Sequence, residues 1–194
     1  MRIQSFHEYC LSLDESLNNP YSWRTTAGAH QGNSYDAEFT VPATASSVPL
    51  DYGVTFTQDK GQEIRGTNDH PWEFTFGALN DRDGAKTDGG AYGYDVTHTG
   101  HAFSVFATVI VIMKAFITKH HPTVIYFSAS ESSRKKLYDR FVKMVSAAVP
   151  GYHGYKLTFA MSRANGYDSY GPDWLTPNGY VIVSSKISPA EYRL

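Results

Sequence analysis

The fold that this sequence predicts depends on the stretch Thr97–Ser128, which reads THTGHAFSVFATVIVIMKAFITKHHPTVIYFS. Its apolar run, Ala102–Ile117, is shorter than the ~20 residues that span a bilayer and contains Lys114, so Ala102–Lys119 predicts a core helix. Thr123–Ser128 then predicts a buried strand, and Ala91–Thr97, on the other side of the turn, predicts another. Strand, glycine turn, helix and strand therefore follow one another, and no membrane span is expected.

The turn before this helix is where a ligand is expected. Unpaired backbone N–H groups at a helix N-terminus, together with the helix dipole, attract phosphate or carboxylate groups. Gly100 would let the backbone approach such an anion closely, and His98 and His101 could add donors. The alternative is an ordinary turn between strand and helix that binds no ligand, since a single glycine is a weak signal.

The residues before this stretch predict a helix and then a small sheet. Ser5–Leu17 has apolar residues at helical spacing and predicts a short amphipathic helix. Tyr21–Phe76 predicts an antiparallel meander, because its strand-like runs are separated by short, turn-rich pieces. The runs that read as strands are Ala37–Val41, Val54–Thr57 and Trp72–Phe76.

After the polar, glycine-rich loop Leu79–Gly90 and the central stretch, the chain predicts a second helix over Glu131–Val149. Two closing strands are expected at Lys156–Met161 and Tyr180–Ser184. We therefore expect one mixed α+β domain over residues 1–194. Its parts are an N-terminal helix over 1–20, a β meander and loop over 21–90, and a core over 91–185.

Composition excludes several classes of function. The 194 residues carry a formal net charge of -2 and no basic stripe, so we expect no nucleic-acid partner. Cys10 is the single cysteine, so no intrachain disulfide can form. Zinc needs three or four converging ligands, and the neighbouring histidines His98 and His101, or His120 and His121, do not supply them. No metal is expected.

The segment Thr97–Ala102 resembles the pyrophosphate-binding motif of GNAT acyltransferases, which reads Gln or Arg, two variable residues, Gly, one variable residue, then Gly or Ala. Thr97 stands where these enzymes usually have Gln or Arg. Ser130–Phe141 resembles the GNAT segment in which Asn or Ser opens a helix and a Leu-Tyr or Phe-Tyr pair follows. The resemblance covers Tyr92–Ser184. It implies a twisted, mostly antiparallel sheet with a parallel strand pair around the cofactor-binding helix.

A tighter resemblance is to small GNAT-like proteins of tailed bacteriophages, and it spans most of the chain. The matching segments are Ser5–Leu11, Val105–Ile110, Tyr126–Ala129 and Leu137–Arg140. Little is known about the activity of these proteins. The resemblance therefore indicates a protein type more than a reaction.

The GNAT resemblance implies that acetyl-CoA would bind at Thr97, His98, Thr99, Gly100, His101 and Ala102. An amine would attack the acyl thioester while a base takes the amine proton and an acid protonates the departing thiolate. Tyr138 matches the helix tyrosine that serves as the acid, and Asp95 and Glu73 are the candidate bases. The alternatives are that Tyr138 packs against the sheet and that the two acids are solvent-facing strand residues.

Two functions stay open from the sequence. The first is an N-acyltransferase that moves an acyl group from coenzyme A to an amine. The second is a non-catalytic phage protein that keeps the scaffold and binds a virion component or a host protein. Either one is expected in the cytoplasm of the host cell or in the virion.

Overall fold

The computed structural model of the chain describes residues 19–26, 33–43, 48–61, 64, 67–79, 102–128, 132–157 and 179–187. For 102–103 and 132–137 it describes the backbone alone. The predicted helix Ser5–Leu17 and the predicted strand Ala91–Thr97 lie outside the described residues. The turn before the long helix lies outside them as well.

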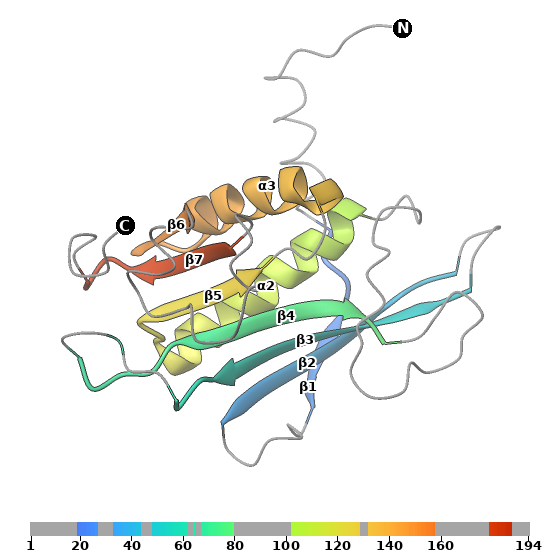
Figure 1. Cartoon of the computed structure of the whole chain (residues 1–194). Coiled ribbons are helices and arrows are strands. Elements are labelled where there is room, and N and C mark those ends of the chain that lie inside the picture. The colour runs from blue at the N-terminus through green and yellow to red at the C-terminus, as the bar shows by residue number, and fades with distance from the viewer. Residues whose placement is uncertain are drawn as a thin grey trace, which may run out of the picture. The chain divides into compact units, whose positions relative to one another are not determined.

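Seven strands and two helices make up the described part of the chain, so the mixed α+β class is confirmed (Figure 1). The predicted helices Ala102–Lys119 and Glu131–Val149 correspond to α2 and α3, within one residue at each end. The elements are β1 (Trp23–Thr26), β2 (Ser34–Val41), β3 (Leu50–Gln58), β4 (Trp72–Ala78), α2 (Ala102–His120), β5 (Val124–Ser128), α3 (Ser132–Ala148), β6 (Tyr152–Lys156) and β7 (Gly179–Ser184).

The strands form one sheet in the order β1-β2-β3-β4-β5-β7-β6. β1 pairs with β2, β5 with β7 and β6 with β7 in antiparallel fashion, whereas β4 and β5 are parallel. A parallel pair needs a long crossover connection, and the chain between β4 and β5 contains α2. The predicted mostly antiparallel sheet is therefore confirmed. The parallel partner of β5 is β4, whereas the strand expected just before the helix, Ala91–Thr97, lies outside the described residues.

The chain divides into two compact units that alternate along the sequence. Unit 1 takes its described residues from Met1–Ala29, Tyr35–Thr55 and Phe76–Ala115, and unit 2 from His30–Ser34, Phe56–Thr75 and Phe116–Leu194. Boundaries between the units fall inside β2, β3, β4 and α2. Each unit is described by itself below.

The core of unit 1 forms around the first half of α2. Phe106 is buried and meets the ring of Phe76 edge-on, with centroids 5.6 Å apart. The Thr108 hydroxyl donates to the Ser104 carbonyl at 2.7 Å and accepts the backbone N–H of Tyr21 at 2.8 Å. Thr108 is fully buried, so these two bonds satisfy a hydroxyl that would otherwise be costly to bury. They also attach the chain just before β1 to the helix.

The core of unit 2 is a layer of aromatic rings. The Phe116 ring of α2 stacks on Phe56 at a centroid distance of 3.9 Å and meets Trp72 edge-on at 5.0 Å. The Phe141 ring of α3 stacks on Phe74 at 5.7 Å, and Phe74 meets Phe127 of β5 edge-on at 5.4 Å. Both helices therefore contribute rings to the face of the sheet that carries Trp72 and Phe74.

Strand β6 begins at Tyr152 and ends at Lys156, whereas the sequence predicts a strand over Lys156–Met161, whose residues 158–161 lie outside the described part of the chain. Gly151 adopts a left-handed φ of 81°, which turns the chain immediately after α3 and lets the strand begin at once. As β6 ends the sheet order, some of its N–H groups point away from β7. One of them, at Gly154, donates to the Ser146 hydroxyl of α3 at 2.8 Å. The helix thus satisfies part of the strand edge.

Replacing Gly154 by alanine should destabilise the chain. A Cβ there would clash with the Val142 side chain and lie 3.0 Å from the Val142 carbonyl oxygen and 3.1 Å from the Ser146 hydroxyl. Overpacking of this kind costs about 1–3 kcal/mol, which urea denaturation would detect. The control is Gly61→Ala in an exposed turn, expected to change stability by less than about 0.5 kcal/mol. Equal effects of the two substitutions would contradict the close contact between β6 and α3.

His121→Gly should stabilise the chain. His121 directly follows α2 with a left-handed φ of 48°, and its N–H donates to the Ile117 carbonyl at 2.9 Å. This conformation strains any residue with a Cβ, so glycine should raise the free energy of unfolding by about 0.5–1 kcal/mol. His121→Ala is the matched control, because it removes the imidazole and keeps the strain. A gain of the same size for alanine would show that the imidazole, and not the backbone, is responsible.

Candidate functional site

The structure places some of the predicted site residues and leaves others outside its description. Asp95 and Thr97–His101 lie outside the described residues, so their part in a cofactor site stays a prediction. Ala102 is the first residue of α2, as predicted. Glu73 lies on β4 and Tyr138 on α3.

The parallel pairing of β4 and β5 is short. It joins Trp72 to Ile125 and Glu73 to Tyr126, at the first residues of β4. Side chains alternate between the two faces of a strand. Trp72 and Ile125 therefore share one face of the sheet, and Glu73 and Tyr126 share the other.

Glu73 is half-buried and has a carboxylate for a neighbour. Burial, and secondarily the negative charge of Asp59, raise the pKa of Glu73 above its usual value. The Tyr126 hydroxyl, from the residue paired with Glu73, donates to Asp59 at 3.3 Å. A carboxylate with a raised pKa is a better match for proton transfer near neutral pH than an ordinary one. Glu73 therefore has the environment of a candidate base.

Tyr138 lies on the other face of the sheet. It is buried, and its ring packs on Phe127 at 5.6 Å and on Tyr180 at 5.9 Å. Phe127 pairs with Tyr180 and, by alternation along β5, faces away from Tyr126 and Glu73. The structure does not bring the two predicted catalytic residues together, because one sheet separates them.

A second tyrosine beside Tyr138 carries the polar contacts on this face. The fully buried Tyr180 donates its hydroxyl to Asp139 at 2.8 Å, and Lys156 approaches the same carboxylate oxygen at 3.4 Å. Burial and the Asp139 carboxylate raise the pKa of Tyr180 well above its usual value, so this phenol stays protonated. The sequence reasoning missed the group, because its members come from α3, β6 and β7.

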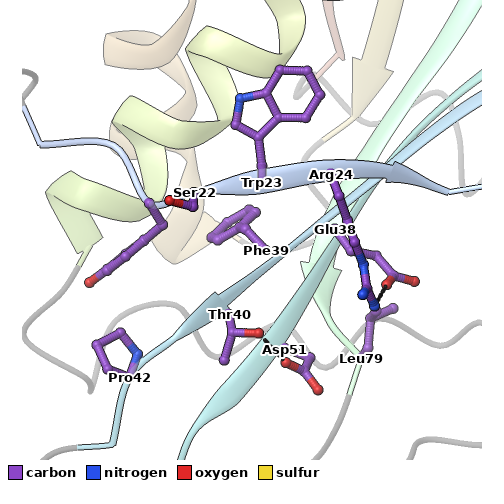
Figure 2. A pocket seen from close by; sticks show the side chains of 10 residues that line it. Ser22, Trp23, Arg24, Glu38, Phe39, Thr40, Pro42, Asp51 and Leu79 are labelled. Atoms are coloured by element: carbon purple, nitrogen blue, oxygen red, sulfur yellow. Dashed lines mark hydrogen bonds and ion pairs between the residues drawn. The ribbon is translucent and has the colours of Figure 1, made fainter.

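Unit 1 has an open groove with a volume of about 720 Å³, which is in the range of ligand sites (Figure 2). Charged and hydroxyl side chains line it together with aromatic and aliphatic ones. The lining residues are Tyr21, Ser22, Trp23, Arg24, Glu38, Phe39, Thr40, Pro42, Asp51 and Leu79.

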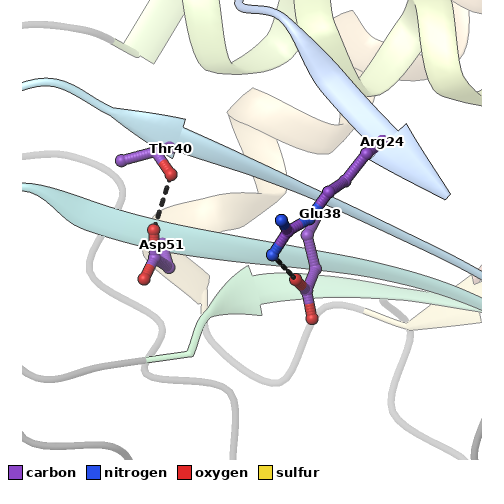
Figure 3. Close-up of polar contacts among 4 residues, drawn as sticks. All are labelled: Arg24, Glu38, Thr40 and Asp51. Atoms are coloured by element: carbon purple, nitrogen blue, oxygen red, sulfur yellow. Dashed lines mark hydrogen bonds and ion pairs between the residues drawn. The ribbon is translucent and has the colours of Figure 1, made fainter. Parts of the chain in front are cut away.

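Strand register explains why the charges gather on one side of this groove. Arg24 pairs with Glu38 across β1 and β2, and its guanidinium reaches the carboxylate at 3.2 Å (Figure 3). Thr40, two residues beyond Glu38 on the same face, donates its hydroxyl to Asp51 of β3 at 2.6 Å. The Trp23 indole points the other way, toward α2 (Figure 2).

The sequence reasoning did not name this groove. The alternation of β2 is a signal that could have found part of it, since Glu38 and Thr40 lie between residues that are buried. Nothing local, however, indicates that Arg24 and Asp51 approach this face from other strands. Their meeting depends on how β1, β2 and β3 are ordered in the sheet.

The described residues show neither a metal site nor a membrane-spanning helix. In the parts of the chain that the structure describes, no three His, Cys, Asp or Glu side chains come together as metal ligands would. Neither of the described helices combines the length and the apolar character needed to cross a membrane.

The structure defines a mixed α+β protein with a parallel strand pair and an open groove. By its sequence the chain belongs to the DUF6934 family, a family of unknown function, whose model matches residues 51–151. That span runs from β3 to the end of α3 and includes Glu73 and Tyr138. Comparison with curated proteins found no significant match, and comparison with solved structures found none either.

The raised pKa of Glu73 predicts a pH-dependent effect of Glu73→Gln. The folded chain keeps the proton of the Glu73 carboxyl to a higher pH than the unfolded chain does. The free energy of unfolding therefore falls as pH rises from the pKa of Glu73 in the unfolded chain to its pKa in the folded chain. We expect Glu73→Gln to be more stable than the parent at neutral pH, and this advantage to shrink in acid, where both side chains are neutral. Urea denaturation between about pH 4 and about pH 8 measures it.

Asp59→Asn is the companion variant for this measurement. It removes the charge that contributes to the raised pKa of Glu73 and should reduce the pH-dependent difference. A difference between Glu73→Gln and the parent that is the same at every pH would contradict the raised pKa.

Proposed function

We propose that this chain is a bacteriophage-type GNAT-like protein that transfers an acyl group from coenzyme A to an amine. The observation that carries the proposal is the parallel pair of β4 and β5, with α2 in the connection between them. The resemblance of Thr97–Ala102 to a pyrophosphate-binding motif puts the cofactor at the start of that same helix.

The first turn of α2 fits an anionic cofactor. It has no acidic residue, so no side-chain charge there opposes the attraction between the helix N-terminus and a phosphate. Bound acetyl-CoA would supply an acyl group activated as a thioester. Thr97, His98, Thr99, Gly100, His101 and Ala102 are the residues that we propose for holding it.

Side chains of this protein would accept and donate the protons of the reaction. As the C–N bond forms and the C–S bond breaks, one proton leaves the amine and one is needed by the thiolate. Glu73 is our first choice for the base, because burial already raises its pKa. Asp95 remains the second candidate for the base. Tyr138, the acid that the resemblance implies, lies on the opposite face of the sheet from Glu73 and would not act together with that base.

A second function is favoured by one specific observation. Tyr138 is buried between Phe127 and Tyr180, on the face of the sheet opposite Glu73. This arrangement suits a scaffold that keeps the fold without the chemistry. Such a protein would bind a virion component or a host protein, in the host cytoplasm or in the particle.

Calorimetry with acetyl-CoA tests the proposal. We expect saturable binding with a dissociation constant below about 1 mM, which is the usual upper range for enzyme substrates. Gly100→Val should weaken binding, because a side chain there would keep the backbone away from the pyrophosphate. Gly61→Val, in an exposed turn of unit 2, is the matched control and should bind as the parent does. Absence of binding by the parent chain would overturn the proposal.

Mass spectrometry of amines incubated with acetyl-CoA then separates the two functions. Transfer that falls by about 100-fold or more in Glu73→Gln supports the acyltransferase, since a general base contributes at least that much. Binding of acetyl-CoA without transfer to any amine in a broad panel would favour the non-catalytic scaffold.

A further inference from the structure

The groove of unit 1 carries a second inference, which does not depend on acyl transfer. We propose that it binds a carbohydrate, through neighbouring hydroxyl groups on an uncharged sugar ring. The proposal rests on a row of polar side chains on one face of β1 and β2, on the bonds that these side chains make, and on the apolar surface beside them.

An ion pair at one end of this row offers donors and acceptors side by side. Arg24 and Glu38 are opposite each other in the register of β1 and β2, and one N–H of the guanidinium reaches Glu38 Oε2 at 3.2 Å (Figure 3). A guanidinium has five N–H donors and a carboxylate accepts about four hydrogen bonds, so this single contact leaves both groups able to bond a ligand. The Arg24 side chain is 79% exposed, which makes its donors accessible.

The ion pair favours an uncharged ligand. A ligand cation would compete with Arg24 for Glu38, and a ligand anion would compete with Glu38 for Arg24. Sugar hydroxyls both donate and accept, so two neighbouring ones can bond to the carboxylate and to the guanidinium without separating them. Each of these bonds involves a charged group and is about twice as strong as a bond between neutral groups.

Thr40 adds an acceptor further along the row. It lies two residues after Glu38 on β2, so the two side chains share a face and are about 7 Å apart along the strand. The Thr40 hydroxyl donates its proton to Asp51 Oδ1 at 2.6 Å, and its oxygen still has lone pairs that can accept (Figure 3). The spacing is comparable with the span of a sugar ring and its hydroxyl groups.

Apolar side chains border the polar row. Pro42, which is exposed, and Leu79, which is half-buried, line the same groove (Figure 2). The C–H groups of a sugar ring make one of its faces apolar, and burying that face on these side chains is favourable. The volume of about 720 Å³ is large enough for a sugar of one or two rings.

A nuclear magnetic resonance titration of the full chain, without acetyl-CoA, tests this inference. The probes are methyl β-glucoside, methyl β-galactoside and methyl α-mannoside, which arrange their hydroxyl groups differently around one ring. We expect saturable binding of at least one of them at millimolar concentration, with shifts of the backbone amides of Arg24, Glu38 and Thr40. Failure of all three to bind, or shifts confined to other parts of the chain, would overturn the proposal.

A ring with fewer hydroxyl groups tests the hydrogen bonds. Cyclohexylmethanol has a ring of similar size and one hydroxyl, and it should bind at least about fivefold more weakly than the glycoside. Equal binding of the two would contradict recognition through neighbouring hydroxyls.

Charged derivatives of the glycoside that binds test whether the ligand is uncharged. The corresponding amino sugar carries a cation and the corresponding uronic acid an anion on the same ring. We expect neither to bind more tightly than the neutral glycoside, because each competes with one member of the ion pair. Binding of either one that is tighter by more than about fivefold, which is more than one weak hydrogen bond contributes, would overturn the proposal.

Variants locate the site. Arg24→Met removes the guanidinium donors and should weaken glycoside binding by about fivefold or more, and Thr40→Val should weaken it by a smaller factor. The matched control is Lys156→Met, which also removes the cation of a partly exposed ion pair, 3.4 Å from Asp139 in unit 2, and should leave binding as it is. Exposed ion pairs contribute little to stability, so both variants should fold. Equal losses in Arg24→Met and Lys156→Met would contradict a site in the groove.

The length of the sugar identifies its source. Tighter binding of a trisaccharide of the same sugar than of the methyl glycoside would assign the groove to a polysaccharide chain, and equal binding would assign it to a single sugar unit. Both results support a carbohydrate site. Failure of every sugar to bind overturns this inference and leaves acyl transfer untouched, whereas sugar binding in a chain that does not bind acetyl-CoA supports the groove and removes the proposed reaction.

Discussion

The parallel pairing of β4 with β5 is the constraint on which most of the described structure depends. Parallel neighbours cannot be joined by a tight turn, so the chain must leave the sheet and return through a helix. That helix, α2, must then bury an apolar surface, and it does so by stacking Phe116 on Phe56 and against Trp72. α3 packs in a similar way, with the Phe141 ring stacked on Phe74. The helix in the β4–β5 connection thus contributes Phe116 to the aromatic layer of unit 2, and α3 contributes Phe141.

The same sheet separates two chemical environments. On the helix-covered face, Tyr138 and Tyr180 lie among aromatic rings, where burial keeps a phenol protonated. On the other face, Glu73 lies beside Tyr126 and near Asp59, where burial and a like charge favour the protonated carboxyl. Chemistry that needs both faces at once is not available to this arrangement.

Much of the fold was predictable because its signals are local. The apolar run of α2, its end at His120-His121-Pro122 and the strand that follows can each be read from consecutive residues, and the structure confirms these elements. The start of β6 at Tyr152 was not predicted, because it depends on a left-handed glycine, Gly151, and on a contact between Gly154 and α3. The alternation of side chains along the strand reveals neither the conformation of Gly151 nor the contact of Gly154.

The sequence by itself determined the mixed α+β class, the two described helices, four of the described strands (β2, β3, β4 and β5) together with β7, and the candidate residues Glu73 and Tyr138. Only the tertiary structure decided that these two lie on opposite faces, because alternation fixes the faces within one strand but not between an α-helix and a strand. It also brought Arg24, Glu38 and Asp51 into one groove. These residues come from three strands, and side chains so far apart in sequence meet only when pairing and register place their strands side by side.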